Sequence, residues 1–345
     1  MSYQVTIQPS GHQFTVEDDE TILEAGLREG FALPYGCRNG ACGACKGKVL
    51  SGQLDYGTHS ANALKDEDKI QGRALFCRAK PLSDLTIEVK EIGAARDIVV
   101  KTLPCRVEKL EKRADDVMLM KIKLPANERL QFLPGQYIDF QLKDGHTRSY
   151  SLANPPHDDA LLELHIRHVP GGLFSDQVFT TMKERDILRL KGPLGSFFIG
   201  EDSDKPIIFV AGGTGFAPVK SMLEHAFAAH VDRELVLYWG VRSMKDLYMA
   251  ELRQQWLAEH PNFSFIPVLS DPQPGDRWQG RTGFVHQAVL ADFADLSGYQ
   301  VYACGAPAMV DSARESFVGT RRLPEDEFFA DAFVYAAETE AAPAS

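Results

Sequence analysis

The sequence predicts a multidomain protein of α+β and α/β class, in which a small α+β unit, an antiparallel β-barrel and a parallel α/β sheet follow one another. Near the start, a cysteine-rich loop follows two alternating segments and a capped helix. Short alternating segments with frequent turns fill the middle, and continuous apolar segments alternate with helical ones toward the end. In a chain of 345 residues we expect domains at 1–92, 102–200 and 205–336, then a disordered tail at 337–345.

The composition is that of an ordinary soluble protein, with 44% hydrophobic and 25% charged residues. The first residues lack the charged and then apolar pattern of a signal peptide. The most apolar stretch, 206–219, is interrupted by glycines and is too short to cross a membrane. We therefore expect a cytoplasmic protein. Its net charge of −11 argues against binding nucleic acid and is compatible with docking to a basic patch on a protein partner.

The first unit begins with two strands and a helix. Apolar and polar residues alternate around 5–7 and again around 14–16, as in half-buried strands. Thr21 and Glu24 have the spacing of a capping box, and Gly30 is placed to end the helix that follows them. A loop rich in cysteine and glycine comes next.

Four cysteines carry the chemistry of this unit: Cys37, Cys42, Cys45 and Cys77. The C-x₄-C-x₂-C…C spacing is that of plant-type [2Fe–2S] ferredoxins, in which four thiolates hold the cluster. Glycines between the cysteines let backbone N–H groups approach the sulfurs, and small alanines leave room for the cluster. We therefore predict a [2Fe–2S] cluster and one-electron chemistry. The order of strand, strand, helix and metal loop is that of the β-grasp ferredoxin fold.

Two other uses of these cysteines are a structural zinc site and disulfide bonds. A structural zinc site favours paired C-x₂-C motifs, and only Cys42 and Cys45 form one. Disulfides are not expected in a chain without a secretory signal. After this unit, residues 91–101 lack a clear turn or helix period and predict a linker. Cys105, just beyond it, is expected to be a small buried core residue.

The second unit has the pattern of an antiparallel barrel. Apolar residues alternate with polar ones over 118–124, 138–142 and 162–167, and turn sequences such as Pro-Gly and Asp-Gly separate these segments. The third unit differs, because apolar residues are continuous at 207–210 and 235–238 and again in two later segments. Helical segments between them, for example 246–260, predict a parallel sheet.

Two motifs of the second unit suit a flavin nucleotide. In an Arg-Ser-Tyr-Ser segment, Arg148 offers a fork for a phosphate, Tyr150 a flat face and Ser151 a hydroxyl near that face. A Gly-Gly-x-x-Ser segment at 171–175 would bring backbone N–H groups to a pyrophosphate at a helix start. The alternatives are a surface ion pair for the arginine and a hairpin turn for the glycines.

Two glycine motifs of the third unit suit a dinucleotide. A Gly-Gly-Thr-Gly segment at 212–215 directly follows a buried strand, and Pro218 suits the first turn of the next helix. This is where open α/β sheets bind nucleotides, although the last glycine of G-x-G-x-x-G is missing. A Cys-Gly-x-Pro segment repeats the arrangement at 304–307. The alternative for Cys304 is a small residue that fills space beside the sheet.

In this order, the four motifs resemble those of the ferredoxin–NADP⁺ reductase superfamily. With the N-terminal ferredoxin pattern, residues 3–335 resemble the reductase components of bacterial multicomponent oxygenases, and they are similar to the CDP-6-deoxy-3,4-glucoseen reductases of deoxysugar pathways. The resemblance implies [2Fe–2S], FAD and NADH as cofactors, with NADPH as a possibility. The cofactor-binding residues would be Arg148, Ser149, Tyr150, Ser151, Gly171, Gly172, Ser175, Gly212, Gly213, Thr214, Gly215, Arg242, Gly305, Pro307, Phe329 and Phe333.

The resemblance also implies individual roles. Ser151 would lie near the flavin N5, and Thr214 and Cys304 would lie near the nicotinamide, so we predict these three as catalytic residues. Phe329 or Phe333 would cover the second face of the flavin, or alternatively pack in an aromatic core. At the strand end that usually reads the ribose, Arg242 could hold a 2′-phosphate. Relatives with this domain order mostly use NADH, so we expect NADH.

The function implied is electron transfer from NADH through FAD and the cluster to a protein acceptor, such as an oxygenase component or a deoxysugar dehydrase. A nicotinamide gives two electrons together and a cluster takes one, so the flavin belongs between them. The alternatives are a free-standing reductase of small acceptors and a redox-sensing iron–sulfur flavoprotein. We expect Arg38 and Asn39 on the cluster loop to form a docking rim, or else to tune the cluster.

Overall fold

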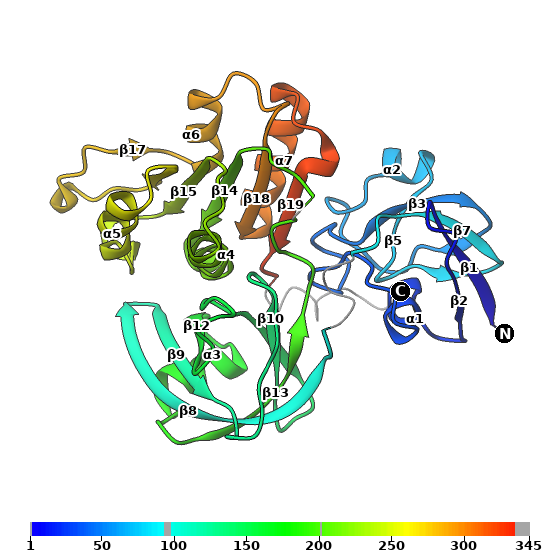
Figure 1. The fold of residues 1–345 in the computed structure, drawn as a ribbon, viewed down its shortest axis with the longest axis horizontal. Helices are drawn as coiled ribbons and strands as arrows, with labels where there is room; N and C mark the ends of the chain where they lie inside the picture. The colour runs from blue at the N-terminus through cyan, green and yellow to red at the C-terminus, as the bar shows by residue number, and fades with distance from the viewer. Residues whose placement is uncertain (1, 93–97, 201, 335–345) are drawn as a thin grey trace. The chain divides into compact units, whose positions relative to one another are not determined.

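The computed structural model describes residues 2–92, 98–200 and 202–334, in two compact units (Figure 1). The first unit comprises residues up to 98 together with 195–197 and the residues from 330 on. The second comprises residues 99–194 and 198–329. The tail expected at 337–345 lies outside the described residues. Within the described part of the chain, no helix combines the length and the apolar character needed to span a membrane.

The first unit is a mixed sheet of five strands in the order β2-β1-β7-β3-β5. Strand β1 runs antiparallel to β2 and parallel to β7, which is the pairing expected of a β-grasp fold. The elements are β1 (Tyr3–Gln8), β2 (Gln13–Val16), α1 (Ile22–Arg28), β3 (Lys46–Ser51), β4 (Leu54–Asp55), α2 (Asp66–Ile70), β5 (Arg73–Leu75), β6 (Lys80–Pro81) and β7 (Leu85–Glu88).

Helix α1 begins and ends where the sequence predicts. Thr21 Oγ1 accepts a hydrogen bond from the Glu24 amide at 3.2 Å, and the Glu24 carboxylate accepts one from the Thr21 amide at 2.9 Å. Gly30 lies just past the last turn with a φ of +86°, a conformation that favours glycine. The capping fixes the helix over the sheet, where Ile22 and Leu23 are buried in the core.

The second unit contains an antiparallel six-stranded sheet in the order β11-β10-β13-β8-β9-β12. The elements are β8 (Lys101–Ala114), β9 (Val117–Lys123), β10 (Tyr137–Gln141), β11 (Thr147–Ser151), β12 (Leu162–Arg167), α3 (Leu173–Thr180) and β13 (Ile187–Leu194). The long strand β8 was not predicted. Its buried residues Leu103, Cys105 and Val107 alternate correctly, but lysine, arginine and glutamate dominate its second half. As expected, Cys105 is a core residue.

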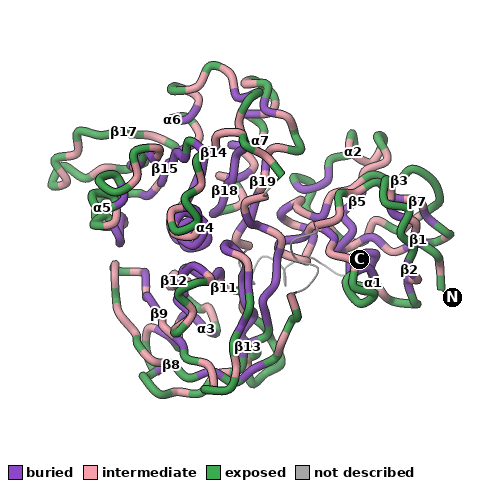
Figure 2. The backbone as a smooth tube through the Cα atoms, in the orientation of Figure 1, coloured by how far each residue is buried: buried purple, intermediate pink, exposed green. Residues whose placement is uncertain are grey.

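The same unit contains a second sheet, in the order β17-β16-β15-β14-β18-β19. Strands β14, β15, β16 and β18 are parallel, and Figure 2 shows β14 and β18 as buried strands. The elements are β14 (Ile207–Gly212), η2 (Gly213–Gly215), α4 (Phe216–Ala228), β15 (Leu235–Val241), η3 (Met244–Asp246), α5 (Glu251–Glu259), β16 (Phe263–Leu269), η4 (Pro274–Asp276), β17 (Arg281–Thr282), α6 (Val285–Asp292), β18 (Gln300–Gly305), α7 (Pro307–Arg321), η5 (Glu325–Glu327) and β19 (Phe328–Ala332).

The fold class expected from the sequence is therefore confirmed in its three parts. One helix is shorter than expected. Instead of one helix over 246–260, a short 3₁₀ turn is followed by a buried turn at 247–249 and then by α5. Asp246 caps the start of the 3₁₀ turn, because its carboxylate accepts hydrogen bonds from the amide and hydroxyl of Ser243. The turn ends at Leu247, whose φ of −79° and ψ of 66° are not helical.

Candidate functional site

The four predicted cluster cysteines meet in the first unit as two pairs. Hydrogen bonds join the thiols of Cys37 and Cys42, and likewise those of Cys45 and Cys77. Backbone amides point at the sulfurs, since the amides of Cys37 and Ala44 lie 3.4 and 3.5 Å from Cys42 Sγ. The loop thus supplies both the thiols and the N–H groups that a sulfur cluster requires.

The paired arrangement fits a two-iron cluster better than the zinc alternative. A tetrahedral zinc would need all four sulfurs around one point, whereas a [2Fe–2S] cluster takes two thiolates on each of two irons. The hydrogen bond from Cys42 lowers the pKa of Cys37 to about 6, and the same contact raises the pKa of Cys42.

Residues far along the chain complete the surroundings of the cluster loop. The Tyr35 amide donates to Ser196 Oγ at 2.8 Å, and the Ser196 amide donates to the Tyr35 carbonyl at 3.0 Å. Asp331 lies beside Gly36 and is buried. Burial raises the pKa of Asp331 to about 7, and the nearby charge of Cys37 adds to the effect. Spacing within the loop gave no sign of Ser196.

The predicted flavin motif lies on β11, which pairs with β10. The Tyr150 ring packs 6.1 Å from that of Phe140 and 5.4 Å from that of Phe174, so its plane is fixed by the barrel core. Burial raises the pKa of Tyr150, which keeps the phenol neutral. Ser151 is buried at the end of the strand. Ser149 instead donates its hydroxyl to Asp139 at 2.6 Å, a contact that ties β11 to β10.

The Gly-Gly-x-x-Ser segment forms the turn into α3. Ser175 Oγ lies 3.1 Å from both the amide and the carbonyl of Val169, so this side chain shapes the turn. Gly171 has a φ of +79°. No described side chain caps the N-terminus of α3 at Gly172. The first amides of a helix lack partners within the helix, and a pyrophosphate suits such a position.

The two glycine motifs of the third predicted domain lie at the ends of neighbouring parallel strands, with Ala211 beside Cys304. Their backbones are in close contact. A Cβ atom at Gly215 would come within 2.1 Å of the Cys304 carbonyl oxygen, and one at Gly305 within 3.1 Å of Gly212 Cα. Glycine is therefore required at these positions, and the bare backbone can approach a dinucleotide closely. Pro307 begins α7, as expected.

Thr214 and Cys304 lie in these loops and are both buried, Cys304 completely. Their predicted contact with the nicotinamide stays a prediction. Two neighbours were missed by sequence reasoning. Met309 Sδ lies 2.6 Å from the position that a Cβ atom would take at Gly212. Arg167 Nη1 lies 2.5 Å from the position that a Cβ atom would take at Gly213. Only the fold brings them to the loops, so no local motif could have found them.

The strand end expected to read the ribose holds Arg242, which is exposed. Its neighbour Ser243 is buried and directs its hydroxyl to Asp246 at 2.9 Å. Near the C-terminus, the Phe329 ring stacks on that of Tyr302, with 4.6 Å between centroids. Phe329 belongs to the second unit and the partly buried Phe333 to the first. Covering of the flavin by either ring stays a prediction.

Comparison with protein families matches all three parts of the chain. Residues 5–82 match a 2Fe-2S iron-sulfur cluster binding domain, 104–199 an oxidoreductase FAD-binding domain and 209–315 an oxidoreductase NAD-binding domain. These matches confirm the expected [2Fe–2S], FAD and nicotinamide cofactors.

Similar proteins match over almost the whole chain. The CDP-6-deoxy-L-threo-D-glycero-4-hexulose-3-dehydrase reductase of Yersinia pestis is 41% identical over 334 residues, which are 97% of this chain and 99% of that protein. The phenol 2-monooxygenase reductase component DmpP of Pseudomonas sp. (strain CF600) is 38% identical over 98% of this chain and 96% of its own. Among solved structures, the Amycolatopsis cytochrome P450 reductase GcoB has a TM-score of 0.77 at 35% identity, covering 96% of this chain and 98% of that one.

Proposed function

Because this chain belongs to the family of reductases that join a [2Fe–2S] domain, an FAD-binding domain and an NAD-binding domain, we propose that it passes electrons from NADH through FAD and the cluster to a separate protein. One observation carries the proposal: the paired cysteines, the flavin motif and the two bare glycine loops occur in one chain. FAD, when bound, supplies the exchange between hydride and single-electron chemistry.

The chain's own residues bind and orient these groups. The glycine loops would receive the dinucleotide against bare backbone, and the first amides of α3 would hold the flavin pyrophosphate. Tyr150, held by its aromatic neighbours, would present a fixed flat face, with the Ser151 hydroxyl beside it. Thr214 and Cys304 would line the nicotinamide site. Burial of these side chains would exclude water from the reacting atoms.

The acceptor we propose is a partner enzyme with its own redox centre. By their names, some of the relatives are reductases of a hexulose dehydrase and others are reductase components of oxygenases. We propose the dehydrase of a CDP-linked deoxyhexose as the first acceptor to test, and an oxygenase component as the second. Since thiolate ligation needs reduced cysteines, we also propose a cytoplasmic location.

We propose NADH as the preferred donor. Asp246 holds its carboxylate at the strand end next to Arg242, where a 2′-phosphate would bring further negative charge. The expected kcat/KM for NADH exceeds that for NADPH by about tenfold or more, from one unfavourable charge contact of about 1.4 kcal/mol. A higher kcat/KM with NADPH would overturn this preference.

Docking through the cluster loop is the remaining part of the proposal. Arg38 and Asn39 are both partly exposed on that loop. Arg38→Glu is expected to slow transfer to the protein acceptor while sparing ferricyanide, a small acceptor. The matched control is Arg185→Glu, which changes another arginine of positive φ, on the exposed surface of the barrel. Equal loss with both acceptors would show that Arg38 acts on the cluster itself.

The central test is an anaerobic titration of the purified protein with NADH. Flavin and iron–sulfur absorption bands should bleach together, and the reduced cluster should give a rhombic EPR signal. Reduction of the flavin without the cluster signal would overturn the electron path. Absence of any bleaching by NADH would favour the redox-sensing alternative.

A further inference from the structure

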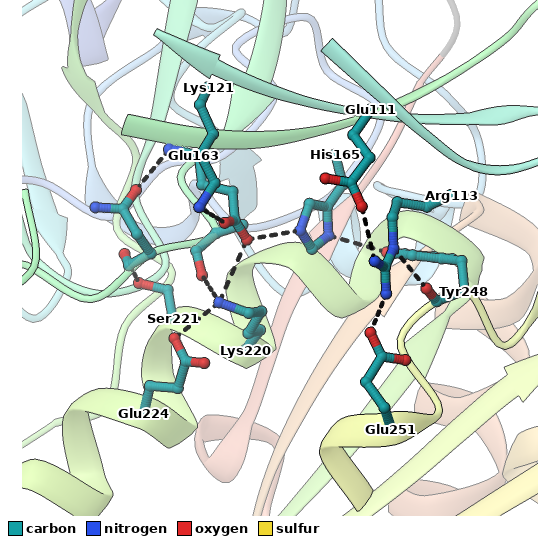
Figure 3. Close-up of polar contacts among 12 residues, drawn as sticks. Glu111, Arg113, Lys121, Glu163, His165, Lys220, Ser221, Glu224, Tyr248 and Glu251 are labelled. Carbon is teal, nitrogen blue, oxygen red and sulfur yellow. Dashed lines mark hydrogen bonds and ion pairs between the residues drawn. The ribbon is translucent and has the colours of Figure 1, made fainter. Parts of the chain in front are cut away.

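Strand β12 presents three alternate polar residues, Glu163, His165 and Arg167, to the nucleotide-binding half of the second unit. Figure 3 shows the first two, with Glu163 directed toward Lys220 and His165 toward Tyr248. Only 7% of Glu163 and 4% of His165 is exposed, although both belong to the polar face of an alternating strand. Residues spaced by two share one face of a strand, so a single face makes all these contacts. The cofactor roles assigned above do not explain why this face is polar.

Each of the three residues contacts a different element of the nucleotide-binding half. The Glu163 carboxylate lies 3.3 Å from Lys220 Nζ on α4. His165 Nδ1 lies 3.0 Å from the Tyr248 hydroxyl in the turn before α5. The Arg167 guanidinium lies against Gly213.

The protonation states within this group follow from its charges and burial. Burial lowers the pKa of His165, so its imidazole is neutral. Burial alone would raise the pKa of Glu163, but the hydrogen bond from His165 and the charges of Lys220 and Lys121 hold it well below its usual range. Burial raises the pKa of Tyr248. The Tyr248 hydroxyl therefore donates to His165 Nδ1, and His165 Nε2–H donates to Glu163 at 3.1 Å.

Aromatic packing continues the group to the glycine loop. The Tyr248 ring meets the Trp239 ring edge-on, with 5.1 Å between centroids, and Phe216 stacks on Trp239 with 4.0 Å between centroids. The Trp239 indole N–H donates to the Gly213 carbonyl at 2.9 Å. A continuous series of contacts thus runs from the barrel strand through Tyr248 to the loop predicted to receive the nicotinamide.

We propose that Glu163, His165 and Tyr248 are positioning residues that hold the Gly212–Gly215 loop in register with the flavin barrel. The inference rests on the proposed function, because the register matters for hydride transfer between the two halves. A displacement of about 1 Å can cost about 100-fold in rate when reacting atoms must lie in near-contact. A buried network in which every group is hydrogen-bonded can hold a geometry this tightly, because breaking one bond leaves a polar atom without a partner.

Tyr248→Phe tests the proposal with the loss of one hydroxyl. The ring keeps its packing on Trp239, but His165 Nδ1 loses its donor. The matched control is Tyr238→Phe, which removes the hydroxyl of another buried tyrosine, one that donates to Asp292 at 2.7 Å. Two measurements are made on the full chain: hydrogen–deuterium exchange of the amides at 211–217 without NADH, and anaerobic stopped-flow reduction of the flavin by NADH.

In Tyr248→Phe we expect loop exchange to accelerate about tenfold, and the limiting rate of flavin reduction to fall about tenfold, for a lost hydrogen bond of about 1.4 kcal/mol. The Kd for NADH should change less than about threefold, because the loop still binds once it is ordered. Tyr238→Phe should change neither exchange nor rate. Unchanged exchange and rate in Tyr248→Phe, with only a lower Tm, would overturn the proposal.

Two variants of His165 separate its two hydrogen bonds. His165→Asn can keep an acceptor near Nδ1 for Tyr248, whereas His165→Gln can keep a donor near Nε2 for Glu163. The reference variant is His165→Phe, which has no nitrogen at either position. The loop amides should exchange more slowly in His165→Asn than in His165→Phe, and equal exchange rates in these two variants would count against the proposal. Should NADH fail to reduce the unmodified flavoprotein, the proposed function fails, while the exchange measurement still decides the positioning role.

Discussion

The cluster loop and the nucleotide-binding glycine loop are both built from small residues, but they are stabilised differently. The cluster loop is held largely from within, by amides directed at its own sulfurs such as the contact from Cys37 to Cys42. The Gly212–Gly215 loop is held from outside, by the indole of Trp239 and the guanidinium of Arg167. The contacts that support the first loop are thus mostly local in sequence, whereas those that support the second come from residues brought to it by tertiary packing.

The largest effect is expected from removing a thiol of the cluster loop. Cys42→Ala should abolish the cluster and its EPR signal and reduce transfer to a protein acceptor by about 100-fold or more, because a thiolate ligand is irreplaceable by a methyl group. Flavin reduction by NADH should persist. Cys105→Ala is the control, since this buried cysteine of the barrel should leave the iron content unchanged. Equal iron loss in the control would contradict the assignment.

A smaller but still large effect is expected from filling the glycine loop. In Gly215→Ala the new methyl group would meet the Cys304 carbonyl at 2.1 Å, which forces the two backbones apart. We expect a loss of about 1–3 kcal/mol in unfolding free energy, and weaker NADH binding by about tenfold, as for overpacking elsewhere. Gly275→Ala is the control, because no heavy atom lies within 4 Å of its Cβ position. Unaltered NADH affinity in Gly215→Ala would show that the backbones can separate without harm.

A moderate effect is expected from Arg167, which supports the glycine loop and pairs with Asp116 at 3.0 Å. Arg167→Ala should remove the planar group against Gly213 and lower the limiting rate of flavin reduction by about threefold to tenfold, the range for one partly exposed contact. Arg167→Lys should restore little, because an ammonium cannot cover the loop as a guanidinium does. Full activity in Arg167→Ala would restrict support of the loop to Trp239 and Tyr248.

The smallest effect is a pH dependence of stability from His165. Its folded pKa is lowered, whereas an unfolded histidine titrates near about pH 6.5. Below that pH the unfolded chain takes up a proton that folded His165 does not. The free energy of unfolding therefore decreases as the pH is lowered, by up to about 1.4 kcal/mol per pH unit. The charged groups that face it are Glu163, Lys220 and Arg113.

Thermal unfolding between about pH 7.5 and about pH 5.5 measures this slope. His165→Asn removes the titrating group, so its Tm should fall less over that range than the Tm of the unmodified protein. Equal slopes in the two proteins would mean that His165 takes up its proton in the folded state. The other histidines are common to both proteins and cancel in the comparison.

The features that the sequence predicted best depend on residues that lie close together in the chain. The cysteine spacing identified the cluster, and Thr21, Glu24 and Gly30 marked both ends of α1. The fold class and cofactors were confirmed because periodicity and motif order carry them. Strand β8 was missed because charged side chains dominate its second half.

The sequence did not predict the residues that hold the glycine loop in place. Glu163 and His165 have the pattern of any polar strand face, and Tyr248 lies in a turn where the sequence predicts a helix. Their partners are distant in sequence, so only tertiary packing brings them together. Residues that act through tertiary packing have no characteristic spacing in the sequence by which they could be recognised.

The polar face of β12 also limits how parts of such reductases can be exchanged. A recombinant that joins the chain near residues 200–205 would combine the barrel of one protein with the nucleotide-binding sheet of another. Glu163 would then meet whatever the donor carries at Lys220, and His165 whatever it carries at Tyr248. The boundary between the barrel and the nucleotide-binding half therefore includes β12. A chimaera should transfer residues 163–167 together with the nucleotide-binding half that they contact.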